Sequence, residues 1–209
     1  WNNKVGSTVW YSTDGGASWV EVPYPLDSPS LNFTGIAVFG GFAEKDGAVY
    51  AADTVANGVW KSTDDGRRWH STDNGIPATP FVGIKLARNV AATTTAVYAV
   101  TPNYGVLRSD DDGTSWRQDN EGIPGTDTVF FGFWREGFDV AALADGTVFA
   151  AVENGLYRRD GATGTWSAVF PTGTGGLPRK LAVDGNTLFV ATTHGGSGSK
   201  ILESTDGGT

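Results

Sequence analysis

The sequence contains no cysteine and no methionine, and it has only two histidines among 209 residues. Without cysteine, the chain forms neither a disulfide bond nor a thiolate metal site. His70 and His194 stand alone, without the three or four converging ligands that a zinc or iron site needs. The run 110–112 consists of three aspartates but lacks the alternating ligands and the closing glutamate of a calcium loop. We therefore expect no metal and no cofactor.

Basic residues are also scarce. The 15 Lys and Arg stand against 23 Asp and Glu, which leaves a net charge of −8. Binding to nucleic acid requires a basic face that neutralises phosphates, so this balance argues against a nucleic-acid partner. No apolar run reaches the length of about 20 residues that a membrane-spanning helix needs, so we also expect no membrane span.

What the sequence does contain is typical of an all-β protein. Its 30 glycines and 9 prolines separate short segments that are rich in Val, Tyr, Phe and Trp. With 39% hydrophobic residues, the chain can bury a core and is not disordered. Because a translated chain begins with methionine and this sequence begins with Trp1, we expect residues 1–209 to be either a processed product or an excised segment.

One pattern recurs along the whole chain. The sequence Ser-x-Asp-x-Gly-x-x-Trp occurs at 12–19, 62–69 and 109–116. In a degraded copy, Arg158 stands in the place of the serine and one extra residue separates the aspartate from the tryptophan, and a last copy at 204–209 has no tryptophan. The aspartates recur about every 48 residues, which indicates a repeat architecture. The residues of the pattern are Ser12, Asp14, Gly16, Trp19, Ser62, Asp64, Gly66, Trp69, Ser109, Asp111, Gly113, Trp116, Asp160, Trp166, Ser204, Asp206 and Gly208.

The chemistry of the pattern fits a hairpin turn between two strands. A short Asp side chain accepts hydrogen bonds from backbone N–H groups of its own turn. The glycine two residues later adopts a positive φ at little steric cost. The tryptophan that begins the return strand buries a large ring. All of these roles are structural, so we expect the repeat residues to determine the fold and not to bind a ligand.

This pattern is the Asp-box, and the chain resembles the Asp-box β-propellers. That superfamily includes sialidases, xyloglucan-degrading glycoside hydrolases, sortilin-type receptors and photosystem assembly factors. The resemblance implies an all-β fold, a β-propeller segment of about four four-stranded antiparallel blades with Asp-box turns between the third and fourth strands. Residues 1–209 then form a single Asp-box β-propeller domain, a segment of a larger propeller with about six to eight blades. Further blades of the same protein are therefore expected as its neighbours.

The repeats also predict the strands of each blade. Apolar runs place second strands at 48–52, 96–100, 147–151 and 187–191, and third strands open at 57–60, 104–107, 154–157 and 199–202. First strands are expected at 33–38, 81–86 and 130–135, with a worn copy at 181–183. Residues 7–11 and 19–22 are expected to form the third and fourth strands of a preceding blade.

The catalytic motifs of the enzymes in this superfamily are missing. Sialidases carry an Arg-Ile-Pro-type motif before the first box, and nothing before Asp14 matches it. Xyloglucanase-type enzymes use an acid and a base carboxylate that face each other across a cleft between two propellers, and the glycine-rich catalytic segment expected near the start of such an enzyme is absent. No catalytic residue is assigned, because the carboxylates outside the repeats have no spacing that pairs them; they include Glu44, Asp53, Asp127, Asp139 and Asp184.

One departure from the repeat is a candidate for ligand binding. The alignment of predicted first strands puts Trp134 where other repeats have Ala37 and Lys85, on the face opposite to the packed position. First strands line the central channel of a propeller, so Trp134 could stack on a sugar ring. Packing between blades is the alternative role. Tyr24 and Tyr104, both in expected loops, are further candidates.

Two classes of function remain. The chain is expected to be a non-catalytic recognition or structural module that binds a glycan or the surface of another protein. The alternative is a segment of a polysaccharide-degrading, xyloglucanase-like glycoside hydrolase whose acid/base carboxylate pair lies outside these residues. The expected location is extracellular, at the cell surface or in the periplasm.

Overall fold

The computed structural model describes residues 8–23, 26–27, 38–79, 83–125, 136–161, 164–171, 176–193 and 198–208. Within these ranges the regular structure consists of β-strands. They contain no helix that is long and apolar enough to cross a membrane. The strands form one two-stranded hairpin and four larger sheets, which follow one another in sequence order.

Each larger sheet corresponds to one sequence repeat, and we call these sheets blades 1 to 4. From the inner strand outward, strands that are consecutive in the sequence pair antiparallel, so the inner strand forms one edge of each blade; in blade 1, β3 also pairs parallel with β7 at the other edge. The N-terminal hairpin consists of β1 (Thr8–Tyr11) and β2 (Val20–Pro23). Blade 1 contains β3 (Leu26–Asp27), β4 (Phe39–Lys45), β5 (Ala48–Asp53), β6 (Val59–Ser62) and β7 (Trp69–Ser71); blade 2 contains β8 (Asn89–Ala92), β9 (Val97–Thr101), β10 (Gly105–Ser109) and β11 (Arg117–Gln118). Blade 3 contains β12 (Gly137–Ala142), β13 (Val148–Val152), β14 (Gly155–Arg159) and β15 (Ser167–Pro171); blade 4 contains β16 (Leu177–Asp184), β17 (Thr187–Thr193) and β18 (Lys200–Ser204).

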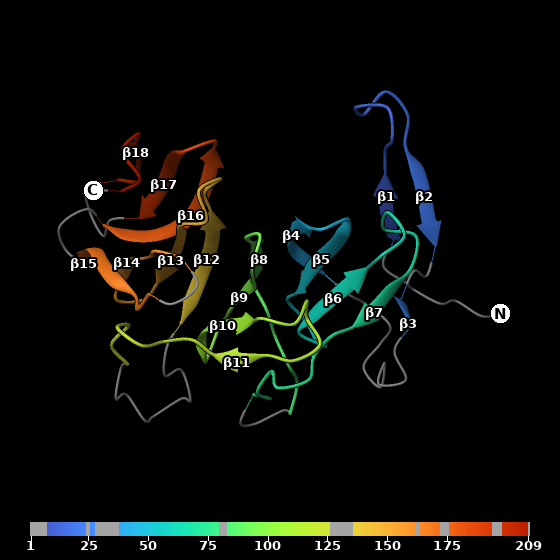
Figure 1. The fold of residues 1–209 in the computed structure, drawn as a ribbon, viewed down its shortest axis with the longest axis horizontal. Coiled ribbons are helices and arrows are strands. Elements are labelled where there is room, and N and C mark those ends of the chain that lie inside the picture. The colour runs from blue at the N-terminus through green and yellow to red at the C-terminus, as the bar shows by residue number, and fades with distance from the viewer. Residues whose placement is uncertain are drawn as a thin grey trace.

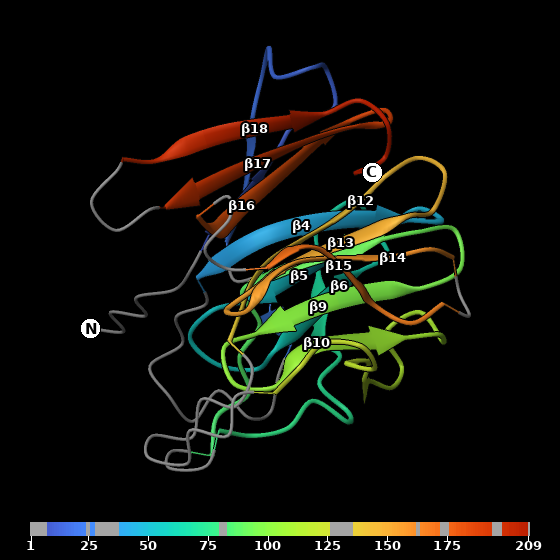
Figure 2. The same ribbon diagram turned by 90° about the vertical axis from the view of Figure 1, so that its left-hand side faces the viewer.

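The blades stand side by side in an arc (Figures 1 and 2). The N-terminal hairpin lies at one end of the arc and blade 4 at the other (Figure 1). The first strands β4, β8, β12 and β16 contact one another in this order across the blade boundaries. We call them the inner strands, because they line the hollow side of the arc.

Neighbouring blades are held together by apolar side chains at the same register positions in each blade. We call the face that a blade turns toward the following blade its forward face, and the opposite face its rear face. The forward face of blade 1 packs against the rear face of blade 2, which contributes Leu107 and Trp116 to a shared core. The forward-face residues are Tyr50, Ala52 and Val59 in blade 1, Tyr98, Val100 and Val106 in blade 2, and Phe149 and Leu156 in blade 3.

The N-terminal hairpin covers part of the rear face of blade 1. Val9 on β1 packs in a core cluster with Trp60 and Trp69. Tyr11 pairs with Val20 in the hairpin in the same way as Lys61 pairs with His70 in blade 1. The strands predicted at 7–11 and 19–22 are therefore confirmed as β1 and β2, in the register of the third and fourth strands of a blade.

The predicted second and third strands are also confirmed. The runs at 48–52, 96–100, 147–151 and 187–191 correspond to β5, β9, β13 and β17. The third strands are β6, β10, β14 and β18. These strands are apolar and flanked by the repeat turns, so burial and turn chemistry both specify their register.

The predicted first strands are wrong where the structure describes them, except at 181–183, which lies in β16. Residues 83–86 form no strand, and the first strand of blade 2 is β8, which begins at Asn89. The reason is that the backbone here bonds to the preceding blade: Lys85 O accepts a bond of 2.9 Å from the Gly58 N–H, and the Ala87 N–H donates to Asp53 O at 2.9 Å. The predictions at 33–37 and 130–135 lie outside the described residues, and the first strands described in those blades are β4 and β12.

Candidate functional site

The three intact repeat copies form the same hydrogen-bonded turn, between β1 and β2, β6 and β7, and β10 and β11. In blade 1, Ser62 Oγ donates to Asp64 Oδ1 at 2.9 Å and accepts a bond of 2.9 Å from the Gly66 N–H. Asp64 Oδ1 also accepts a bond of 2.8 Å from the Arg68 N–H. This bond contributes most to lowering the pKa of Asp64 below its ordinary value. The carboxylate is thus engaged within its own turn.

The turn of blade 2 also binds blade 1. Tyr50 donates its hydroxyl to Asp112 O at 3.0 Å, and Lys45 Nζ lies 2.8 Å from Asp112 Oδ1. The hydrogen bond to Asp112 is the main reason that the pKa of Lys45 is raised, and burial raises the pKa of Tyr50 to about 12. Gly113 has φ +84°, and an added Cβ would lie 3.1 Å from the Tyr50 ring. This glycine therefore serves both the turn and the junction between the blades.

The degraded copy in blade 3 has a different alignment from the one that the sequence predicted. Arg159 pairs with Val148 as Ser109 pairs with Val97, so Arg159 and not Arg158 replaces the serine. No extra residue is needed, because the spacing from Arg159 to Trp166 equals that from Ser109 to the tryptophan of blade 2. The sequence alignment was anchored on Asp160, whose carboxylate in fact bonds to Arg158 Nε at 2.7 Å.

Blade 3 replaces the missing turn bonds with a contact across the junction. Arg159 Nη1 lies 3.3 Å from Asp119 Oδ1 of blade 2, and both side chains are buried. Trp166 Nε1 donates to the Asp119 backbone oxygen at 2.7 Å. A buried ion pair of this kind is destabilising when one partner is removed, because the other charge stays buried.

The inner strands line a cavity of about 270 Å³ on the hollow side of the arc. Small side chains dominate its wall, which leaves room between the blades. The lining includes Ala43 on β4, Ala91 on β8, Ala141 on β12 and Ala182 on β16. Because all four blades contribute to its lining, the cavity forms only when the four inner strands lie side by side.

One polar network crosses the inner strands. The pairing registers place Gly41, Asn89, Asp139 and Lys180 at equivalent positions in blades 1 to 4. The Asn89 amide donates to the Asp139 carboxylate, which also accepts a bond of 2.9 Å from the Leu181 N–H. Asp139 therefore links three blades, and its burial and bonds make it a structural residue and not a free acid or base.

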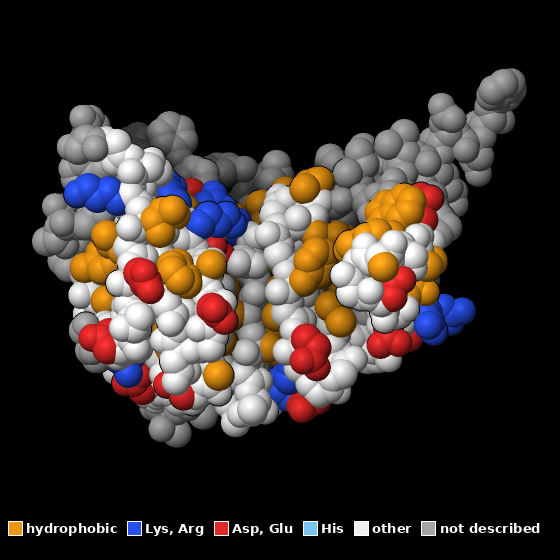
Figure 3. Space-filling view, turned by 90° about the horizontal axis from the view of Figure 1, so that it is seen from above, with side chains coloured by type: hydrophobic (Ala, Val, Ile, Leu, Met, Phe, Trp, Pro, Cys, Tyr) orange, Lys and Arg blue, Asp and Glu red, His pale blue; other side chains and the backbone are white. Residues whose placement is uncertain are grey.

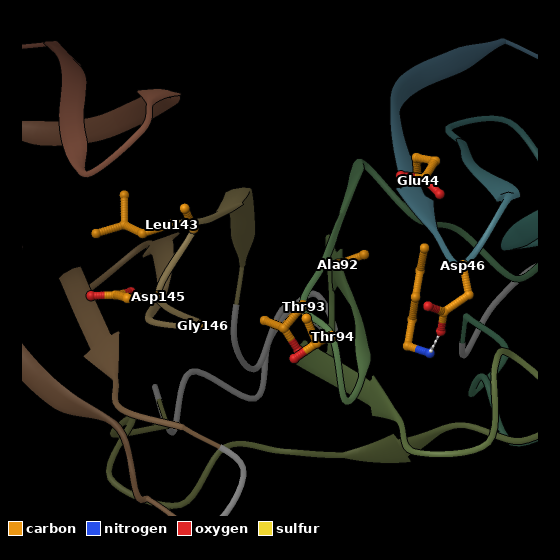
Figure 4. A pocket seen from close by; sticks show the side chains of 10 residues that line it. Glu44, Asp46, Ala92, Thr93, Thr94, Leu143, Asp145 and Gly146 are labelled. Carbon is orange, nitrogen blue, oxygen red and sulfur yellow. Dashed lines mark hydrogen bonds and ion pairs between the residues drawn. The ribbon is translucent and has the colours of Figure 1, made fainter.

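A second pocket, of about 360 Å³, opens where three hairpins meet at one end of the inner strands. Its side chains come from the β4–β5, β8–β9 and β12–β13 turns, and Glu44 and Asp145 lie on opposite sides of it (Figure 4). Glu44 Oε1 accepts a bond of 2.8 Å from the Gly47 N–H, and Asp145 Oδ1 accepts one of 2.8 Å from the Thr147 N–H. This bond lowers the pKa of Asp145, so the group stays ionised and is poorly suited to act as a general acid.

The remaining candidate carboxylates give no catalytic pair in the described part of the chain. Asp53 is fully buried and accepts bonds from the Val55 and Ala56 N–H groups and from Trp60 Nε1. Asp184 ends β16 and is exposed, and Asp127 lies outside the described residues. Among the described residues, no three His, Asp or Glu side chains are grouped to hold a metal ion.

The predicted ligand-binding residues have different outcomes. Tyr104 is partly buried, and its hydroxyl donates to Ala78 O at 2.7 Å, which ties it to the segment between blades 1 and 2. Trp134 and Tyr24 lie outside the described residues. The argument for Trp134 assumed a first strand at 130–135, whereas β12 begins at Gly137. The residues that sequence reasoning missed are those of the inner strands, whose small and polar side chains give no apolar pattern.

Side chains of different chemistry are mixed on the face seen from above, where apolar, acidic and basic groups are interspersed (Figure 3). No single charge dominates this face, so it offers no extended basic surface for phosphates.

Comparison with known proteins supports the fold. No family model matches the sequence, and no curated protein sequence matches it either. Solved structures do match: a GH74 enzyme of Niastella koreensis has a TM-score of 0.63 and 20% identity over 96% of this chain and 33% of its own. The GH74 xyloglucanase of Xanthomonas campestris has a TM-score of 0.61 and 18% identity over 97% of this chain and 33% of its own.

A third match is the extracellular domain of a hybrid two-component system of B. thetaiotaomicron. Its TM-score is 0.57, with 14% identity over 96% of this chain and 25% of that one. The chain thus spans a quarter to a third of the length of these three proteins. At these identities the likeness concerns the fold alone. Together with the four-stranded antiparallel sheets in an arc, it shows that the chain has an all-β fold of the β-propeller type.

Proposed function

We propose that this chain is a non-catalytic, Asp-box type β-propeller module that acts outside the cell, where it binds a glycan or the surface of another protein on the hollow side of its arc. The observation that carries this proposal is the state of the carboxylates around the two pockets. Glu44 and Asp145, which line the pockets, each accept a backbone N–H bond that holds a turn; the buried Asp139, which lines neither pocket, accepts one that holds a junction. A glycosidase instead needs two carboxylates that flank the scissile bond and can exchange protons.

Isothermal titration with xyloglucan oligosaccharides tests the proposal, because the GH74 structures motivate this probe. Ala182 lines the cavity and is exposed, so Ala182→Trp should fill the cavity and abolish binding. Lys200→Trp on the exposed β18 is the matched control and should bind normally. If Ala182→Trp binds as well as the unchanged chain, the hollow side is not the ligand site. If neither this probe nor a panel of glycans and proteins binds, the recognition function is wrong.

The alternative is a segment of a glycoside hydrolase whose acid/base pair lies outside residues 1–209. The likeness to two GH74 enzymes motivates it. Release of reducing ends from xyloglucan separates the two proposals. The natural polypeptide should release none if the module is non-catalytic, and hydrolysis by that polypeptide would favour the alternative.

Trp134 remains the candidate for stacking on a sugar. By analogy with nucleic-acid bases stacked on aromatic side chains, we expect Trp134→Ala to weaken glycan binding by about 1–3 kcal/mol, with nearly the same unfolding midpoint. Packing between blades predicts the reverse, with unchanged binding and a stability loss of about 3–5 kcal/mol. Binding and unfolding measured on this one variant distinguish the two roles.

A further inference from the structure

The two ends of the arc expose side chains whose counterparts are buried at every internal junction. On the N-terminal hairpin, Trp10 is 54% exposed and Trp19 is 58% exposed. Their register counterparts in blade 1, Trp60 and Trp69, are 0% and 1% exposed. The local sequence and the turn are the same, so the difference lies in what covers the ring.

In blade 1 these two rings face the preceding unit. Trp60 and Trp69 pack with Val9 of the N-terminal hairpin. The rings of Phe39 and Phe42, on β4 of the same blade, lie 5.8 and 6.0 Å from that of Trp69. By register, Trp10 and Trp19 hold the same places on the rear face of the hairpin. That face is therefore built for a preceding blade.

The indole hydrogen bonds of blades 2 and 3 cross their junctions. Trp116 Nε1 donates to Thr72 O of blade 1 at 2.6 Å, and Trp166 Nε1 donates to Asp119 O of blade 2 at 2.7 Å. Trp19 Nε1 instead donates to the oxygen of Gly16 in its own turn, at 3.1 Å. Trp69, although buried against the hairpin, also donates within its own turn, to Gly66 O at 2.9 Å, so indole bonds across a junction are found in blades 2 and 3.

The other end of the arc shows the complementary face. By register, Phe189, Ala191 and Ile201 of blade 4 hold the forward-face positions that Tyr50, Ala52 and Val59 hold in blade 1. Ile201 is 78% exposed, whereas Val59 is fully buried. Within the described residues, β18 forms the edge of its sheet, where blades 1, 2 and 3 pair a fourth strand. Such an edge presents unpaired backbone groups to a further strand.

We infer that both faces are junction surfaces covered by further blades of the same polypeptide, outside residues 1–209. The blade that covers Trp10 and Trp19 presents an aromatic side chain from its second strand and a branched aliphatic one from its third, as blades 1 to 3 do. The blade that covers Ile201 brings the apolar rear face and the cross-junction indole that blades 2 and 3 have.

A second copy of the chain fits these faces poorly. In its described residues, the N-terminal hairpin of such a copy carries only third-strand and fourth-strand positions, so it has no second strand to face Phe189. A complete blade covers all of these positions, as blade 2 covers the forward face of blade 1. Continuity with the internal junctions therefore favours further blades over a second copy.

Hydroxyl-radical footprinting of the natural polypeptide, read by mass spectrometry, tests the inference. Rates for Trp10, Trp19 and Ile201 are normalised to the intrinsic reactivity of each residue type. Trp116 and Trp166 are the buried standards, and Val55, exposed in the β5–β6 turn, is the exposed standard. We expect Trp10, Trp19 and Ile201 to react as slowly as the buried standards, at every protein concentration.

Two results would overturn the inference. Reactivity of Trp10, Trp19 and Ile201 at the level of Val55 would show that the faces stay open in the natural polypeptide. Protection that disappears on dilution would show that a separate copy covers them. As an independent variant, Ile201→Lys should lower the melting temperature of the natural polypeptide, whereas Thr205→Lys in the exposed turn should leave it unchanged. Equal melting temperatures for the two variants would contradict a buried Ile201.

Discussion

The internal blades and the N-terminal hairpin carry the same motif in different surroundings. Ser12 and Ser62 make the same bonds in their turns: each hydroxyl accepts from the glycine N–H at 2.8 and 2.9 Å. Yet Trp69 is buried and Trp19 is exposed. The comparison shows that the motif specifies the turn locally, whereas burial of the tryptophan depends on a neighbouring blade. The turn and the junction are therefore separate contributions to stability and can be measured separately.

The largest difference is expected for the tryptophans. In the chain of residues 1–209, Trp166→Ala should lower the free energy of unfolding by about 3–5 kcal/mol, as for other truncated core aromatics. Trp19→Ala should change it by no more than about 0.5 kcal/mol, as is usual at an exposed position. Urea unfolding followed by circular dichroism measures both. Equal losses would mean that the two rings have the same surroundings in solution.

The glycines of the junction allow a matched test of close approach. Gly75 and Gly47 both have positive φ, +83° and +79°, so replacement by alanine costs each about 1–2 kcal/mol of backbone strain. A Cβ on Gly75 would also collide with the Trp116 carbonyl oxygen of the next blade, whereas a Cβ on Gly47 meets nothing. We expect Gly75→Ala to destabilise the chain by about 1–3 kcal/mol more than Gly47→Ala. Similar unfolding midpoints for the two variants would show that the close approach of Gly75 to Trp116 does not limit the residue at this position.

The serines test the turn itself. Ser62 is fully buried, so Ser62→Ala leaves the Gly66 N–H without its partner and should cost about 1–3 kcal/mol. In the exposed hairpin, water can replace the lost bond, so Ser12→Ala should cost clearly less. Thermal unfolding of the two variants gives the comparison. A cost for Ser12→Ala equal to that for Ser62→Ala would show that burial does not set the strength of the turn.

The smallest effect is that of pH on the turn aspartates. Hydrogen bonds lower the pKa of Asp14 from 3.8 to about 2. The bond from the Ser18 hydroxyl contributes most, followed by those from the Ser18 N–H and the Ser12 hydroxyl. A lowered folded-state pKa contributes stability that is fully present above pH 3.8 and is lost as the pH falls through about 2. Because the group is exposed, solvent screening keeps the contribution small. A carboxyl NMR titration should place the Asp14 midpoint near 2, and Ser18→Ala should raise it. An ordinary midpoint in the unchanged chain would contradict the turn geometry.

Sequence reasoning predicted the parts of the fold that depend on local chemistry. The second and third strands are apolar and adjoin the repeat turns, so their positions follow from the sequence. The inner strands could not be found in the same way, because Gly40, Gly41 and Asn89 break the apolar alternation. Their positions are set by contacts between blades, such as the bond from Asn89 to Asp139, which are 50 residues apart in the sequence.

The candidate site was harder to predict for the same reason. The cavity exists only where four inner strands meet, and each contributes small residues such as Ala91 and Ala182 that carry no chemical signature of their own. The degraded repeat shows a related limit. The sequence pattern aligns Asp160 with the other aspartates, but strand pairing puts Arg159 in the serine position. The ion pair of Arg159 with Asp119 joins residues 40 positions apart.

Hydrogen exchange of the tryptophan indole N–H groups in the chain of residues 1–209 tests most directly whether repeated junctions hold the arc together. NMR resolves each indole, and Trp116 and Trp166 donate across junctions whereas Trp19 donates within its own exposed turn. We expect the indoles of Trp116 and Trp166 to exchange slowly, at a rate limited by unfolding of the blades, and that of Trp19 to exchange fast. Exchange of Trp116 and Trp166 as fast as that of Trp19 would contradict it.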